Sequence, residues 1–409
     1  MSIPLRLAIP RGFRAAGVRA GIKESGALDL AVIVADRPCR GVGNFTTNRV
    51  AAAPVQWDRS RVPNDDIRAI VINSGNANAA TGREGLENVR RTAEVAAKKL
   101  GCEPDQILVA STGVIGHQLP MDRLLDGLGR AIDAATDDES GFRDAAQAIL
   151  TTDSRPKVHS ELRVIGGVPV AMLGVAKGAA MIGPKMATML SFIITDANID
   201  MLLMQACLSI VIDHSFNCIS VEGHTSTNDT VLLLSSAASG GPELGRSPVE
   251  DATELDKLSD FDTLLYHTCV SLARMIPDDG EGSTHLITID VLGCETRDQA
   301  RTIARAVADS PLVKTAIAGA DPNWGRIVSA AGYAGVPFEE NELSLWIDDV
   351  LLYQDGVPLP FDAADVSARI RRHREVNLRL SLSQGERSVR FWTCDLTAEY
   401  VRLNADYTT

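Results

Sequence analysis

Residues 162–195 read LRVIGGVPVAMLGVAKGAAMIGPKMATMLSFIIT. Two apolar runs, 162–165 and 168–173, flank Gly166 and Gly167, and this pattern predicts a β-hairpin with a two-residue turn. A third apolar run, 189–195, predicts a strand that is entered directly from the glycine-containing loop before it. The centre of the chain is therefore expected to form sheet.

The sequence before this stretch alternates between the two periodicities. Short apolar runs predict buried strands at 30–34, 67–72 and 107–110, and helical patterns cover 121–135 and 142–150. Asn-Ser-Gly-Asn-Ala-Asn at 73–78 and Ser-Thr-Gly at 111–113 predict turns after two of the strands. Thr81 and Glu84 form a capping-box pattern ahead of a helix that carries apolar residues at 86, 89, 93, 96 and 100.

The sequence after this stretch is similar in kind. Helices are expected at 200–212, 262–275 and 297–309, and strands at 230–234, 285–292, 343–347, 376–382 and 389–392. Gln384-Gly385 predicts a hairpin between the last two strands. Strand–strand and helix–strand successions are mixed, which favours α+β layers in two domains over a purely parallel sheet.

The overall charge excludes several classes of protein. The chain has 409 residues and a formal net charge of −13, whereas a nucleic-acid-binding protein needs a basic face. The N-terminus lacks the pattern of a signal peptide, and no run is long enough to predict a membrane span. We expect a cytoplasmic protein that binds neither nucleic acid nor membranes.

Metal and dinucleotide sites are not indicated either. The seven cysteines form no C-x-x-C pair, and the seven histidines are scattered, so we expect reduced thiols and no metal site. Gly41-Val42-Gly43 lacks the third glycine of a dinucleotide fingerprint.

The segment from Lys177 to Leu190 is the most unusual in the chain. Two lysines, two glycines and a proline precede Thr188, which stands at the entry to an apolar strand. On the residues alone, a plain glycine-rich connection between strands is the favoured interpretation. The alternative is that the bond after Ala187 is cut, because a free α-amine on Thr188 could act as the base for its own hydroxyl.

The segment resembles the self-processing signature of the ornithine acetyltransferases, also called bifunctional glutamate N-acetyltransferases. Further stretches are similar to that family in the same order along the chain. They are PRGFRAAGV at 10–18, FTTNRV at 45–50, NSGNANA at 73–79, STGVIG at 111–116, TSTNDT at 225–230, DGEG at 279–282, DPNWGR at 321–326 and NADYTT at 404–409. The resemblance implies an αββα-layered, self-cleaving N-terminal-nucleophile fold.

The resemblance also implies roles for single residues. Thr188 would be the nucleophile, first for cleavage after Ala187 and then for acetyl transfer. Thr112 and Gly113 would form the oxyanion hole, although both also suit a plain turn.

Further positions match those at which the family binds substrate: Thr151, Lys177, Thr188, Glu281, Asn404 and Thr409. Lys177 could pair with a substrate carboxylate and Glu281 with an ammonium group. Thr152 could replace Thr151, Glu281 could equally be a solvated loop acid, and the C-terminal residues a frayed tail.

The implied reaction moves an acetyl group from N2-acetylornithine to glutamate through an acetyl-threonine, in arginine biosynthesis. No cofactor is implied, and many family members also accept acetyl-CoA as donor. The mature protein would consist of an α chain, 1–187, and a β chain, 188–409, in an α2β2 assembly. Two alternatives stay open, a self-activating amidase or aminopeptidase and a non-enzymatic binding protein on the same fold.

The chain departs from the family at two places. Glu222 and His224 stand where Asp-Gly-Asp is more usual, and His285 stands where lysine is more usual. We expect these residues to affect substrate preference rather than the reaction.

Overall fold

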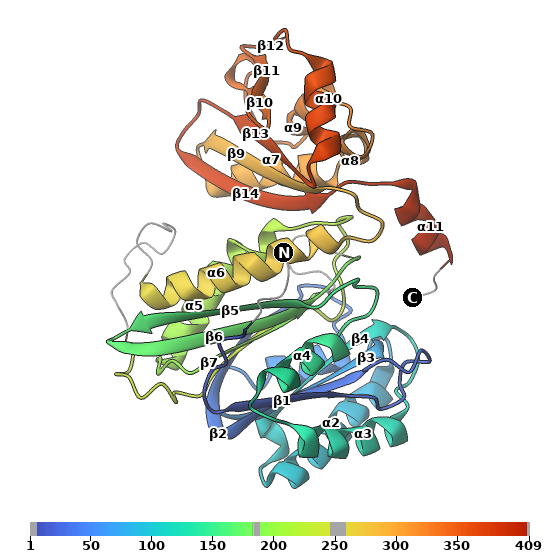
Figure 1. Cartoon of the computed structure of the whole chain (residues 1–409), viewed down its shortest axis with the longest axis vertical. Coiled ribbons are helices and arrows are strands. Elements are labelled where there is room, and N and C mark those ends of the chain that lie inside the picture. Colours follow the sequence, from blue (N-terminus) through green and yellow to red (C-terminus); the bar gives the residue numbers. More distant parts are fainter. Residues whose placement is uncertain (1–5, 182, 184–188, 246–258, 407–409) are drawn as a thin grey trace.

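The computed structural model describes residues 6–181, 183, 189–245 and 259–406. Figure 1 shows two sheets, one of eight strands and one of six, with helices packed against both. The predicted mixed α/β class is confirmed.

The larger sheet has the order β4-β3-β2-β8-β7-β6-β5, with β1 paired to β2. Its strands are β1 Phe13–Val18, β2 Leu30–Phe45, β3 Asn64–Asn76, β4 Ile107–Val114, β5 Lys157–Ile165, β6 Val168–Lys177, β7 Leu190–Thr195 and β8 Thr230–Ser235. The pairs β3–β4 and β7–β8 are parallel and the others antiparallel. The hairpin predicted around Gly166 and Gly167 is confirmed, because Ile165 pairs with Val168 and both glycines have positive φ.

Strand β2 bends this sheet into two layers. Its first residues pair with β3, whereas residues 40–45 pair with β8 after two register shifts. Apolar side chains from the two halves pack against each other in one buried cluster, which includes Ile33, Ile72, Leu108, Val175, Phe192 and Leu232. Because this cluster lies between the two halves, the sheet forms the two inner layers of a sandwich.

Helices other than α4 form the outer layers. The helices of this half of the molecule are α1 Ala53–Arg59, α2 Gly82–Leu100, α3 Met121–Ala134, α4 Glu139–Ala148, α5 Met201–Asp213 and α6 Asp260–Met275. The buried residues of α4, such as Phe142, belong to the cluster between the two sheet halves. Helices α2 and α3 cover the β1–β4 half, and α5 and α6 cover the β5–β8 half (Figure 1). The αββα packing that the resemblance implies is therefore present.

Two details of these helices need comment. The capping box predicted at Thr81 is wrong, because the Thr81 side chain accepts no hydrogen bond from the first turn of α2. Its hydroxyl instead donates to Asn78 Oδ1 (2.6 Å). The stretch Met201–Cys218 has the length and composition of a membrane span. However, α5 covers only 13 of these residues and is about 20 Å long. The face of α5 that carries Leu208 is buried in the core.

The smaller sheet has the order β12-β11-β10-β13-β9-β14. Its strands are β9 Leu286–Cys294, β10 Ser344–Ile347, β11 Val350–Gln354, β12 Val357–Pro358, β13 Glu375–Ser381 and β14 Arg387–Cys394. The helices of this half are α7 Arg297–Asp309, α8 Pro311–Ala318, α9 Trp324–Gly332, α10 Ala363–Arg372 and α11 Ala398–Asp406.

The hairpin predicted at Gln384-Gly385 is wrong. Strands β13 and β14 do not pair, because β9 lies between them, parallel to β13 and antiparallel to β14. The connection crosses the end of β9, where the N–H groups of Gln384 and Gly385 both donate to the Gly293 carbonyl.

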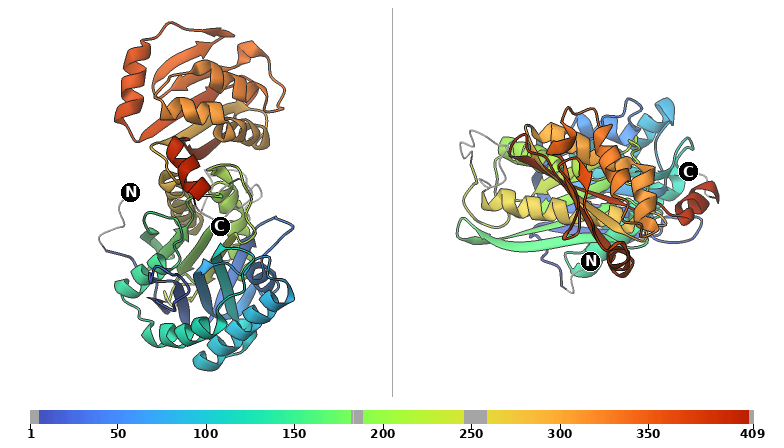
Figure 2. Two further views of the ribbon diagram at one scale, coloured as in Figure 1. Left: turned by 90° about the vertical axis from the view of Figure 1, so that its right-hand side faces the viewer. Right: turned by 90° about the horizontal axis from the view of Figure 1, so that it is seen from above.

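The two sheets lie at opposite ends of the long axis, and α11 lies between them (Figure 2). The chain passes from one to the other through the 3-10 turn Pro277–Asp279 and residues 280–285. The predicted boundary between residues 187 and 188 does not coincide with this linker. It lies between the neighbouring strands β6 and β7 of the larger sheet.

Candidate active site

A pocket of about 280 Å³ lies at the ends of β4 and β6, where the linker and α11 close it. Its lining comprises Ala77, Thr112, Gly113, Ile115, Thr151, Thr152, Lys177, Ala180, Met181, Glu222, His224, Thr225, Ser226, Thr227, Asn228, Glu281, Tyr400 and Asn404. Six predicted site residues, far apart in the sequence, therefore meet here: Thr112, Gly113, Thr151, Lys177, Glu281 and Asn404. Both Thr151 and Thr152 line the pocket.

Three other predicted residues, Ala187, Thr188 and Thr409, lie outside the described part of the chain. The nearest described residue after the predicted cleavage point is Met189. Its N–H donates to Asp229 Oδ1 (2.9 Å), and its carbonyl accepts from the Thr230 N–H. Asp229 is fully buried, and burial raises its pKa well above the usual value.

Thr112 and Gly113 lie within the last residues of β4, and not in the turn that their sequence predicts. Parallel pairing continues to this point, with Gly75 of β3 opposite Gly113. Gly113 has φ of 129°, and a Cβ atom there would lie 2.4 Å from the Gly75 carbonyl carbon. Only glycine fits here, so the peptide at Gly113 can turn toward the pocket.

Lys177 is the last residue of β6 and is 2% exposed. Its Nζ donates to Thr112 Oγ1 (3.1 Å) and Thr151 Oγ1 (2.8 Å). Burial lowers the pKa of Lys177, while the nearby Asp153 carboxylate opposes that shift.

Asp153 fixes the backbone next to Lys177 and the backbone of its partner Thr151. Its carboxylate accepts from the N–H groups of Gly178 (2.6 Å) and Thr151 (3.2 Å). Burial disfavours its charge, but Lys157 and Lys177 outweigh that effect and lower the pKa of Asp153 to about 2.

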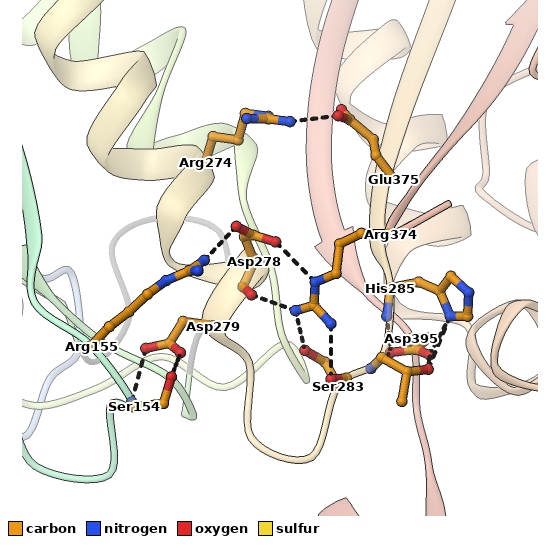
Figure 3. Close-up of polar contacts among 11 residues, drawn as sticks. Ser154, Arg155, Arg274, Asp278, Asp279, Ser283, His285, Arg374, Glu375 and Asp395 are labelled. Carbon is orange, nitrogen blue, oxygen red and sulfur yellow. Dashed lines mark hydrogen bonds and ion pairs between the residues drawn. The ribbon is translucent and has the colours of Figure 1, made fainter. Parts of the chain in front are cut away.

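A buried ion cluster extends from Asp153 to the linker. Lys157 Nζ lies 2.6 Å from carboxylate oxygens of both Asp153 and Asp279, and all three side chains are at most 5% exposed. Figure 3 shows the linker side of this cluster, where Asp279 accepts from Ser154.

The neighbouring Asp278 pairs with Arg155 and with Arg374, and Arg374 also donates to Ser283 (Figure 3). These contacts connect the segment after α4, the linker and the start of β13. They fix the linker on both sides of Glu281, which lines the pocket.

The opposite end of the pocket is acidic. Asn404 Nδ2 donates to Glu281 Oε2 (2.9 Å) and also to the Tyr400 carbonyl (3.0 Å). Burial, together with the charges of Glu222 and Glu281, raises the pKa of Tyr400 to about 12. The pocket thus places a buried ammonium group at one end and two carboxylates at the other.

Sequence reasoning gave no role to several lining residues. The run 225–228 was noticed only as a similar motif, although it forms one wall, with Asn228 Nδ2 donating to the Ser111 carbonyl (2.8 Å). Tyr400 stands one helical turn before Asn404 on α11, and this i, i+4 spacing is a signal that could have found it.

The departures from the family pattern separate into two groups. Glu222 and His224 line the pocket, so they lie where they can affect substrate preference. His285 lies elsewhere, with Nδ1 2.9 Å from Asp395 Oδ2 (Figure 3). Its Nε2 lies 3.1 Å from the Ile370 carbonyl oxygen.

No group of three or more His, Cys, Asp or Glu side chains in the described ranges has an arrangement that could hold a metal ion. All seven cysteines are free, and all except Cys102 are buried.

Known proteins resemble this chain over nearly its whole length. Residues 14–409 match the ArgJ family. The chain belongs to the ArgJ family. It is 44% identical to the arginine biosynthesis bifunctional protein ArgJ of Rhodopirellula baltica, over 98% of this chain and 96% of that protein. It is also 44% identical to ArgJ 1 of Nostoc sp., over 98% and 97% of the two chains. The resemblance seen in the sequence is therefore confirmed.

Proposed function

We propose that this protein transfers an acetyl group from N2-acetylornithine to glutamate through an acetyl ester on Thr188. Membership of the ArgJ family makes the chain an acyltransferase of arginine biosynthesis. The observation that carries the finer proposal is the convergence of six predicted residues, from five separate segments, in one pocket.

The proposed chemistry has two acyl-transfer steps. The Thr188 hydroxyl attacks the acetyl carbonyl while the Thr188 α-amine takes up the hydroxyl proton. Thr112 Oγ–H and Gly113 N–H stabilise the negative charge on the carbonyl oxygen. The C–N bond breaks as the Thr188 α-ammonium gives that proton to the leaving nitrogen, and ornithine departs. The neutral α-amine of glutamate then attacks the ester, a new C–N bond forms as the ester C–O bond breaks, and the proton of the amine passes through the Thr188 α-amine to the Thr188 oxygen.

The charge distribution of the pocket supports acetylornithine as donor. Its α-carboxylate suits the third N–H of Lys177, and its δ-ammonium suits Glu281 at the acidic end. Acetyl-CoA is a second donor to test.

An assay of the purified protein with each donor tests this function. We expect acetylglutamate from acetylornithine plus glutamate, with parallel lines in double-reciprocal plots because ornithine must leave before glutamate reacts. Acetate release that needs no glutamate would instead identify an amidase. Intersecting lines without an acetylated Thr188 would exclude the covalent intermediate.

Self-cleavage between Ala187 and Thr188 is the second part of the proposal, and it would divide the chain into 1–187 and 188–409. We expect two fragments from the wild type and a single chain from Thr188→Ala, whereas Thr188→Ser, which keeps a hydroxyl, should still be cut. Cleavage of Thr188→Ala at the same bond would identify an outside protease. Native mass measurement would test the α2β2 assembly, and cell fractionation the cytoplasmic location.

A further inference from the structure

Lys177 contacts the side chain to which the oxyanion hole is assigned. An ammonium group has three N–H donors and no acceptor. Lys177 Nζ contacts the hydroxyl oxygens of Thr112 and Thr151. In both contacts the threonine oxygen must therefore accept.

This direction fixes where the Thr112 proton can point. A hydroxyl that accepts a hydrogen bond from a cation keeps its own O–H free to donate elsewhere, and the cation makes that O–H a stronger donor. Thr112 is 4% exposed and lines the pocket. Its proton is thus available to a charge that develops on an oxygen in the pocket.

We propose that Lys177 is a positioning residue for the oxyanion hole, because its contact orients the Thr112 hydroxyl as a donor toward the reacting carbonyl oxygen. The inference rests on the proposed function and assigns Lys177 a task besides substrate binding. It applies to both reactions at Thr188, self-cleavage and acetyl transfer.

Backbone pairing and hydrogen bonds hold Lys177 and its partner Thr151 in fixed positions. Lys177 pairs with Leu190 at the end of the β6–β7 ladder, and the next N–H, of Gly178, donates to Asp153. The same carboxylate holds the N–H of Thr151, the second partner of Lys177. Asp153 is in turn held by Lys157, so the contact is organised before any substrate binds.

Self-cleavage separates this role from substrate binding, because it passes through an oxyanion but involves no substrate carboxylate. The precursor is made by cell-free synthesis, and the rate of cleavage is followed on denaturing gels. The variants are Lys177→Met, which keeps length without a donor, Lys177→Arg, Thr112→Val, Thr112→Ser and the double variant Lys177→Met/Thr112→Val. Circular dichroism and thermal melting check the fold of each.

We expect Lys177→Met to slow cleavage by at least about 10-fold and Thr112→Val by about 10²–10³-fold. The double variant should be no slower than Thr112→Val alone, because the lysine acts through the hydroxyl. Lys177→Arg and Thr112→Ser, which keep the donors, should recover part of the rate. Lys314→Met is the matched control, since Lys314 is also buried and its Nζ donates to a threonine hydroxyl, Thr393 Oγ1 (3.0 Å), that does not line the pocket.

Acetylation of Thr188 by p-nitrophenyl acetate, which has no carboxylate, gives a second readout on cleaved protein. Wild-type cleavage rates in a folded Lys177→Met variant, with only KM for acetylornithine raised, would overturn the inference and leave Lys177 as a carboxylate ligand. Additive effects in the double variant would also overturn it. A wild type that is not cleaved would instead contradict the proposed function.

Discussion

At the scale of single residues, position 113 must be glycine for steric reasons, and its N–H has a proposed role in the oxyanion hole. Gly113→Ala would place Cβ 2.4 Å from the Gly75 carbonyl carbon at a φ of 129°. We expect a loss of about 1–3 kcal/mol in the free energy of unfolding and slower cleavage, because β3 and β4 must separate locally. Thermal melting and the cleavage gel measure the two effects.

Gly116→Ala is the matched control for this prediction. Gly116 also has a positive φ, 81°, but nothing lies within 4 Å of a Cβ added there. It should show backbone strain alone and normal cleavage. Equal effects of the two substitutions would contradict the steric argument.

Glu281 defines the acidic end of the pocket. Glu281→Gln keeps the shape but removes the charge, and we expect KM for acetylornithine to rise about 10-fold, corresponding to a charge-assisted hydrogen bond. Self-cleavage should be unchanged, because no substrate ammonium group is bound during that reaction. Glu84→Gln on the exposed side of α2 is the control, and an unchanged KM in Glu281→Gln would remove Glu281 from substrate binding.

At the scale of elements, Lys157 joins β5 to the linker. Lys157→Met would leave the buried carboxylates of Asp153 and Asp279 without their shared cation, so we expect a loss of about 3–5 kcal/mol in urea unfolding. Lys99→Met breaks the exposed pair with Asp133 and should cost at most about 1 kcal/mol. Similar losses in the free energy of unfolding in both variants would show that burial does not make the Lys157 cluster more important for stability than an exposed ion pair.

His285 connects the start of β9 with α10 and the end of β14. Its hydrogen bond to Asp395 raises the pKa of His285, and both ring nitrogens can donate to their acceptor oxygens only when the ring is protonated. A raised folded-state pKa contributes stability that is complete below the unfolded pKa of about 6.5 and is lost as pH rises through the folded pKa. We expect the urea midpoint to fall over that range.

His285→Lys tests this assignment, because a lysine keeps its charge to higher pH. The fall in urea midpoint between about pH 6 and pH 9 should become shallower in this variant. The same slope in wild type and His285→Lys would assign the pH dependence to other groups.

At the scale of the whole molecule, the proposed cut runs through one sheet. Strand β6 before it pairs with β7 after it over six residue pairs, and β8 also pairs with β2. We expect the fragments 1–187 and 188–409 to elute together in gel filtration, at the volume of uncut Thr188→Ala, and to separate only in denaturant. Separation in native buffer would contradict this prediction.

The sequence predicted the local elements well because their signals are local. The hairpin at Gly166-Gly167 and helix α7 required only turn chemistry and periodicity, and both are confirmed. The hairpin at Gln384-Gly385 failed, because nothing local shows that β9, some ninety residues earlier, is inserted between the two strands. Thr81 failed as a cap because its backbone, with φ −106° and ψ 2°, does not have the extended conformation of a capping residue.

By itself, the sequence determined the family and the layered fold class, because ordered motifs and periodicity lie along the chain. It also predicted a set of site residues, six of which line one pocket. Only the tertiary structure decided that Glu222, His224 and Tyr400 share the pocket with these residues and that His285 does not. It also decided that Lys177 contacts Thr112, 65 residues away. The physical reason is that strand order and the bend in β2 bring distant segments together, and no local propensity encodes those contacts.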